Sequence, residues 1–160
     1  MKKLLIALGI LILLGIAYYL LSPFWRNKEL NDVSPVSQQQ NPISSTGSQT
    51  ASMSTISSRI IAQANFVPKA HDVKGKALLI EENNQYTLRF EDFETINGPD
   101  VNIYLASDLN NKDIVDLGDI KATKGNVNYA IPAGTDLTKY NKVLVWCKAF
   151  AVLFSYAELK

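Results

Sequence analysis

Two side chains of this 160-residue chain could carry redox or metal chemistry, and each is the only one of its type. Cys147 lies in an apolar stretch near the C-terminus, and His71 lies near the start of the region expected to fold with it. A thiolate can ligate haem iron or copper, or form a mixed disulfide with a partner protein. Cys147 is therefore the redox candidate. Cys147 and His71 together are the candidate cofactor-binding pair, with haem or copper as the cofactor. The alternative is that Cys147 is a small buried core residue and His71 an ordinary loop residue.

The residue counts exclude several other kinds of site. One cysteine allows no disulfide within the chain and no multi-cysteine zinc or iron–sulfur cage, and no C-x-x-C-H motif is present for covalent haem attachment. The 16 basic and 15 acidic residues give a net charge of +1, which provides no basic field for nucleic acid. No G-x-S-x-G motif occurs, and Glu81 and Glu82 would point to opposite faces of a strand. We therefore lean away from an enzyme such as a hydrolase or transferase, and predict no separate metal site.

The elements that must position Cys147 have a period of two residues, which is typical of β-strands. Three runs alternate apolar and polar side chains, with apolar positions at Tyr86, Leu88, Phe90, Val101, Ile103, Leu105, Val127, Tyr129 and Ile131. Turn-forming Asn, Gly and Pro residues separate these runs. The pattern predicts an all-β domain over residues 66–160, built as a small antiparallel β-sandwich or barrel. The apolar stretch 142–160 is too long for one strand, so we expect two strands broken around 148–151, with the cysteine strand central and covered on both faces.

The N-terminal segment has a different character. Leu4 to Leu21 is a run of 18 residues without a charge, preceded by two lysines. As a helix it would be roughly 27 Å long, which is close to the thickness of a bilayer core. We predict a single-pass transmembrane signal anchor over 4–21, with the C-terminal domain on the extracytoplasmic side of the cell membrane. A signal peptide cleaved after the small-residue triplet Gly15-Ile16-Ala17 is the alternative, and it places the domain in the same compartment.

A polar segment follows the apolar run. Between residues 31 and 59, eighteen of 29 residues are Ser, Thr, Gln or Asn. Such a composition has little apolar surface to offset the entropy lost on ordering. We predict a disordered linker over residues 30–65.

Three blocks of the C-terminal region resemble a known family. They are Asn97-Gly98-Pro99-Asp100-Val101, the run from Gly125 to Pro132, and VLVWCKAFAVLFSYAEL from Val143 to Leu159. Together they are similar to the DM-thirteen domain, the β-rich module of Skeletor-type proteins that also occurs beside DOMON domains. The resemblance covers about residues 66–160. It implies an extracytoplasmic module that takes part in electron transfer through a cysteine at the position of Cys147. It also implies that the redox partner is another protein or a bound cofactor.

Two other functions remain open at this stage. A non-enzymatic β-sandwich could bind a protein, glycan or lipid at the cell surface, through an exposed aromatic patch formed by Tyr104, Tyr140 or Tyr156. The acidic loop 108–119 could instead hold calcium loosely, although it does not fit an EF-hand, because Lys112 and Asp113 occupy positions where a ligand and a glycine are required.

Overall fold

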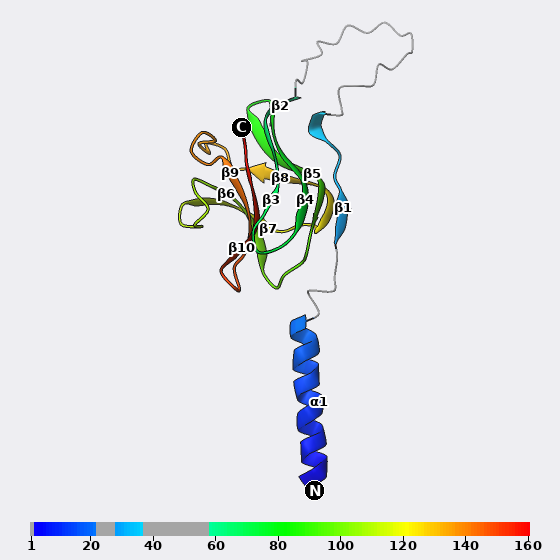
Figure 1. Ribbon diagram of the computed structural model, residues 1–160. Helices are drawn as coiled ribbons and strands as arrows, with labels where there is room; N and C mark the ends of the chain where they lie inside the picture. The colour runs from blue at the N-terminus through cyan, green and yellow to red at the C-terminus, as the bar shows by residue number, and fades with distance from the viewer. Residues whose placement is uncertain (1, 22–27, 37–57) are drawn as a thin grey trace, which may run out of the picture.

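The computed structural model describes residues 2–21, 28–36 and 58–160 (Figure 1). The described elements are one helix and ten strands. They are α1 Lys2–Leu21, β1 Glu29–Asn31, β2 Ser58–Asn65, β3 Val67–Pro68, β4 Val73–Glu82, β5 Gln85–Thr95, β6 Val101–Ala106, β7 Ile114–Asp119, β8 Lys124–Ile131, β9 Lys142–Cys147 and β10 Val152–Glu158. The prediction of an all-β domain after one N-terminal helix is confirmed.

The strands form two five-stranded sheets. The first sheet has the order β1-β8-β5-β4-β2, and the second has the order β3-β10-β9-β6-β7. Every pairing is antiparallel except that of β1 with β8, which is parallel. One buried cluster draws its residues from both sheets, so the two sheets pack face to face as a β-sandwich.

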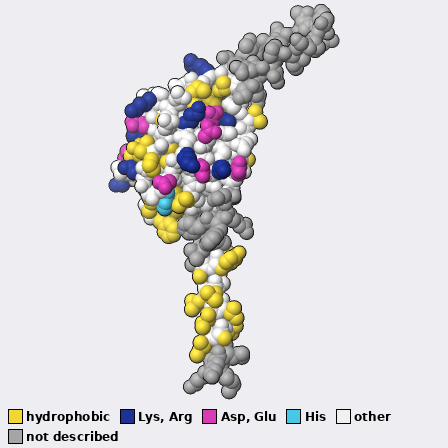
Figure 2. Space-filling model, turned by 45° about the vertical axis from the view of Figure 1, so that its right-hand side comes forward, with side chains coloured by type: hydrophobic (Ala, Val, Ile, Leu, Met, Phe, Trp, Pro, Cys, Tyr) yellow, Lys and Arg dark blue, Asp and Glu magenta, His cyan; other side chains and the backbone are white. Residues whose placement is uncertain are grey.

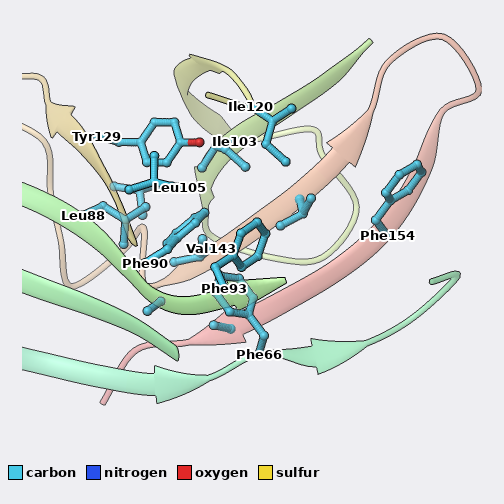
Figure 3. Packing of buried hydrophobic residues seen from close by; sticks show 14 of the residues in the cluster. Phe66, Leu88, Phe90, Phe93, Ile103, Leu105, Ile120, Tyr129, Val143 and Phe154 are labelled. Carbon is cyan, nitrogen blue, oxygen red and sulfur yellow. The ribbon is translucent and has the colours of Figure 1, made fainter. Parts of the chain in front are cut away.

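Aromatic rings fill much of the space between the sheets (Figure 3). Phe90 is fully buried, and its ring lies 4.9 Å from those of Phe66 and Phe93 and 5.2 Å from that of Tyr129. The alternation expected for β5 and β8 places Phe90 and Tyr129 inward, and a register shift between Phe90 and Phe93 turns Phe93 to the same side. The interior of the sandwich is therefore apolar and closely packed around these rings.

The last two strands follow the predicted pattern. β9 ends at Cys147, a turn occupies residues 148–151, and β10 starts at Val152. The turn is closed by Ala151, whose backbone adopts a left-handed φ of 51°. β9 lies between β6 and β10, so the prediction of a central strand is confirmed. In β10 the register shifts between Leu153 and Ser155, which leaves Phe154 as the extra residue of a β-bulge.

The predicted disordered linker over residues 30–65 is wrong at both ends. β1 pairs with β8 at the start of that segment, and β2 pairs with β4 at its end. Both are edge strands, and most of their side chains are exposed. Their polar composition therefore resembles that of a linker, while main-chain hydrogen bonds to the neighbouring strand supply the order. Residues 37–57 of the predicted linker lie outside the described residues.

The N-terminal helix was predicted as a transmembrane anchor over residues 4–21. The helix itself is present as α1, and its described side chains, Ile6 to Tyr19, are all exposed. In the part of the chain that the structure describes, no helix has the length and apolar character needed to cross a membrane.

Candidate functional site around the single thiol

Cys147 is the last residue of β9 and is fully buried, with 0% of its surface exposed. Its neighbours across the sheet are Val101 on β6 and Val152 on β10. The side chain belongs to the main core between the two sheets, in the same inward-facing row as Val143 and Val145. In the closed structure the thiol is thus a core side chain, and apolar burial of this kind makes a cysteine unreactive.

Although it is buried, the thiol lies at one end of the sandwich. We call this the thiol end and define it by the segments 69–72, 96–100, 120–123 and 148–151. Hydrogen bonds tie the segments together: the amide of Lys148 donates to the carbonyl of Asp100 at 2.8 Å, and that of Ile120 donates to the carbonyl of Val101 at 2.8 Å. The hydroxyl of Thr95, which precedes the second segment, donates to the carbonyl of Asp72 at 3.3 Å. Loops rather than long strands therefore close the core beside Cys147.

The bulged residue Phe154 is part of that closure. Its side chain is 3% exposed and lies near the β9–β10 turn, apart from the central rings (Figure 3). A Cβ built on Gly98 would lie 3.1 Å from the Phe154 ring and 2.8 Å from the side chain of Val101. Gly98 thus packs directly against the phenyl ring and against the residue opposite the cysteine. Any larger residue there would push these two groups apart.

His71 packs against the outside of this closure. Its ring meets that of Phe154 edge to face at 4.2 Å, and its amide donates to the Phe154 carbonyl at 3.3 Å. The amides of Lys69 and Ala70 donate to the carbonyls of Phe154 and Leu153. No hydrogen bond or ring contact among the described residues joins the imidazole of His71 to the thiol of Cys147. The sequence did not predict the contact with Phe154, because nothing in a loop residue's neighbours reveals its tertiary partner.

Haem or copper does not fit these residues as they are arranged. The Cys147 side chain is enclosed by the close-packed core, and the imidazole of His71 is packed on Phe154 instead of being directed to the thiol. Cavities of about 190 and 390 Å³ are present, but neither is lined by Cys147 or His71. Within the described residues, no group of three or more His, Cys, Asp or Glu side chains could hold a metal ion.

On the opposite face of β9, Lys148 joins a polar network that sequence reasoning missed. Its Nζ donates to Asn102 Oδ1 at 2.9 Å and lies 3.5 Å from Asp116 Oδ2, and the Asn102 amide donates to Asp100 Oδ1 at 2.7 Å. Desolvation tends to lower the pKa of Lys148, but Tyr104 and Asp116 outweigh it and raise that pKa. In the sequence, this network is indicated only by the polar Asn102, which stands between Val101 and Ile103 in an otherwise apolar strand.

The aromatic patch predicted from three tyrosines is not present as such. Tyr104 is 1% exposed, which excludes it as a surface residue, and Tyr140 and Tyr156 are half-buried. Tyr104 instead forms a small second core on the outer face of the second sheet, together with Ala106 and Leu144. The exposed aromatic residue of this region is Phe150, at 62%.

The carboxylates of the acidic loop 108–119 bond to the protein itself. Asp113 accepts hydrogen bonds from Ser107 and Tyr140 and pairs with Lys139 at 2.9 Å. The hydrogen bonds from Lys139, Tyr140 and Ser107 lower the pKa of Asp113 to about 2. Asp116 accepts from the amide of Gly118.

The structure thus defines a small two-sheet β-sandwich with a single buried thiol at one end. A family model described as Electron transfer DM13 matches residues 65–159. Because this match covers more than half of the chain, the protein belongs to the Electron transfer DM13 family, as its sequence blocks predicted. No curated protein and no solved structure matches the chain.

Proposed function

We propose that this protein is a membrane-tethered extracytoplasmic redox module whose Cys147 thiol reacts after local opening of the thiol end. The observation that carries the proposal is the position of Cys147 as the last residue of β9, directly before the 148–151 turn. A thiol in the middle of a central strand would become accessible only on complete unfolding. A thiol at the end of a strand needs only the neighbouring loops to move.

The chemistry available to a single thiol is exchange with a disulfide of a partner protein. The Cys147 thiolate attacks one sulfur of that disulfide, and a new sulfur–sulfur bond forms as the old one breaks. The second partner sulfur leaves as a thiolate and takes up the proton that Cys147 released. Atoms and electrons balance between the two proteins, so the step needs neither a metal nor a further oxidant.

Several features make the thiol end easier to open than the rest of the core. The 148–151 turn is exposed, and Ala151 adopts a backbone conformation that is unfavourable for an L-residue. Ser155, opposite Val145 in β10, is fully buried, and among the described residues its hydroxyl has no hydrogen-bond partner. An unpaired buried hydroxyl costs about 1–3 kcal/mol, which the chain recovers when β10 opens to water. We expect opening to begin at the 148–151 turn and to reach Ser155 as β10 separates from β9.

The tether rests on the sequence. The uncharged run from Leu4 to Leu21 and the lysines before it are typical of a signal anchor with its N-terminus in the cytoplasm. The extracytoplasmic side is also where a disulfide-bearing partner would be found, because disulfides persist in oxidising compartments.

Disulfide exchange of the full chain in lipid vesicles tests the proposal. An aromatic disulfide such as dithiobis-nitrobenzoate should react with one thiol per chain, slowly but without unfolding. Phe154→Ala should raise the rate, because it removes the ring that closes the thiol end. Phe90→Ala is the matched control, since it creates a cavity of the same kind on the facing sheet, where the ring neighbours are Phe66, Phe93 and Tyr129.

Equal rates for the two variants at equal loss of stability would contradict the proposal. Such a result would mean that Cys147 reacts only in the unfolded chain. The remaining function would then be the alternative of a surface binding module, with the cysteine as a structural residue.

A further inference from the structure

An exposed apolar tip lies at the thiol end. Phe150 forms the tip of the β9–β10 turn with 62% of its surface exposed, and Ala149 and Ala151 beside it are also exposed. Ile96, in the adjoining loop, is 40% exposed. The space-filling view shows hydrophobic side chains gathered beside the single histidine at this end of the β domain (Figure 2). An aromatic side chain at a loop tip gains little from the fold itself, since its ring faces water.

The chain enters the β domain at this same end. Lys28 is the first described residue after α1, and its carbonyl accepts hydrogen bonds from the amides of Thr123 and Lys124 at 2.8 and 3.1 Å. Its own amide donates to Thr123 Oγ1 at 3.1 Å. Lys28 also lines the cavity of about 190 Å³ together with Gly98 and Val101. The domain is therefore fastened to the incoming chain beside Cys147.

The length of the connection limits how far this end can lie from α1. From Leu21 to Lys28 there are seven residue steps, which span at most about 25 Å when fully extended. The opposite end, near Ala133, lies beyond the whole of β8, whose eight residues add about 26 Å. If α1 is anchored, the thiol end is held next to the membrane, and the opposite end is held away from it.

We infer that the thiol end docks on the bilayer surface and that Phe150 inserts its ring into the lipid interface. The inference rests on the proposed membrane tether. The segments of the thiol end carry exposed charges of both signs, among them Lys69, Lys148, Asp72 and Asp100. The apolar side chains, not a net charge, therefore supply the attraction, and a neutral lipid is sufficient. The disulfide partner of Cys147 must then be reached at the membrane surface.

Tryptophan fluorescence of the full chain in vesicles tests this orientation. The native tryptophans are replaced by Trp25→Phe and Trp146→Phe, and either Phe150→Trp or Ala133→Trp is added. Ala133 is the matched control, because it is exposed and follows β8 at the opposite end. The vesicles contain phosphatidylcholine with a fraction of doxyl-labelled phosphatidylcholine as quencher. Phe150→Trp should emit at shorter wavelength and be quenched at least about twofold more strongly than Ala133→Trp, as expected for a ring 5–10 Å into the interface.

Flotation of the same samples distinguishes a failure of the membrane tether from a failure of the docking of the thiol end. If the chain floats with the vesicles after an alkaline wash and the two tryptophans are quenched equally, the tether stands and the docking of the thiol end is wrong. If the chain does not float, both the tether and the docking that depends on it are wrong. Strong quenching of Phe150→Trp in a floating chain, with native circular dichroism, supports the inference.

Discussion

The two faces of β9 differ in how they are closed to water. On the inner face, Val143, Val145 and Cys147 are all fully buried, so the row stays dry to the end of the strand. On the outer face, burial is greatest in the middle of the strand and falls towards the thiol end: Lys142 is half-buried, Leu144 is fully buried, Trp146 is half-buried, and Lys148, just after the strand, is exposed. The outer face is therefore open at the same end at which the inner face holds the thiol.

The gradient on the outer face follows from what covers it. Near the start of β9, Leu109 and Ile114 pack over Tyr104 and Leu144. Towards the thiol end, the cover is replaced by the polar contacts of Lys148. The outer face is thus less buried beside Cys147 than at Leu144.

Of the substitutions that test this difference, Leu144→Ala should lower the free energy of unfolding most. Removing a fully buried leucine costs about 2–5 kcal/mol, even though Leu144 lies on the outer face. Trp146→Phe, one position further towards the open end, should cost less than about 1.5 kcal/mol. The free energy of unfolding, measured with urea, checks both values. If both substitutions lower the free energy of unfolding equally, the outer face of β9 is not less buried towards the thiol end, and the contrast between the two faces is wrong.

The buried Tyr129 predicts a loss of stability at high pH. Desolvation raises its pKa to about 12 from the ordinary value of 10, although a hydrogen bond from the Lys121 amide opposes the shift. The folded chain then holds the phenolic proton more tightly than the unfolded chain. Stability from this group is fully present below pH 10 and is lost as the pH rises to 12, by about 2–3 kcal/mol.

Urea titrations between pH 9 and pH 12 measure this loss. Tyr129→Phe should lower the stability at neutral pH slightly and flatten the alkaline dependence. A variant that keeps the full alkaline dependence would show that other groups cause it, and would weaken the description of the interior as apolar and closely packed.

Cys147→Ser tests the inner face at the thiol itself. A hydroxyl placed in this row would be a second unpaired polar group beside that of Ser155, at a cost of about 1–3 kcal/mol. Ala149→Ser, two residues further on and exposed, should change stability by less than about 0.5 kcal/mol. Thermal unfolding of both variants gives the contrast. A Cys147→Ser variant as stable as the parent would mean that water already reaches the thiol position.

Removing the ion pair between Lys74 and Glu94 should change the free energy of unfolding least. The pair lies on the first sheet, with the two side chains 75% and 49% exposed, at a distance of 3.1 Å. Exposed pairs contribute little to stability and are screened by salt. A double-mutant cycle with Lys74→Met and Glu94→Gln should give only a small coupling energy that disappears in 1 M salt. A larger coupling that survives salt would show that this sheet face is less exposed than described.

The sequence predicted the parts of the fold that bury side chains. We predicted the strands β5 and β8 and the strand break around residues 148–151. These features depend on the contrast between apolar and polar positions, which can be read directly from the sequence. β1 and β2 were missed because edge strands are ordered by main-chain hydrogen bonds, which leave little trace in composition.

The candidate site was predictable only in part. Cys147 was identified because it is unique and because it lies in the block shared with the family. The contact of His71 with Phe154 depends on a bulge in β10 and on a loop 83 residues away in the chain, which no local pattern encodes. The network of Asn102 and Lys148 likewise joins side chains from different strands. Local periodicity gives the face of a strand, whereas partners across loops come only from tertiary structure.

The most direct test of local opening is the rate of Cys147 modification as a function of urea below the unfolding transition. Opening of the thiol end exposes little surface, so the free energy of exposure should depend only weakly on urea and stay below the global free energy of unfolding. A dependence as steep as that of global unfolding, with the same extrapolated free energy, would show that the thiol is accessible only in the unfolded chain. The redox proposal for Cys147 would then be wrong.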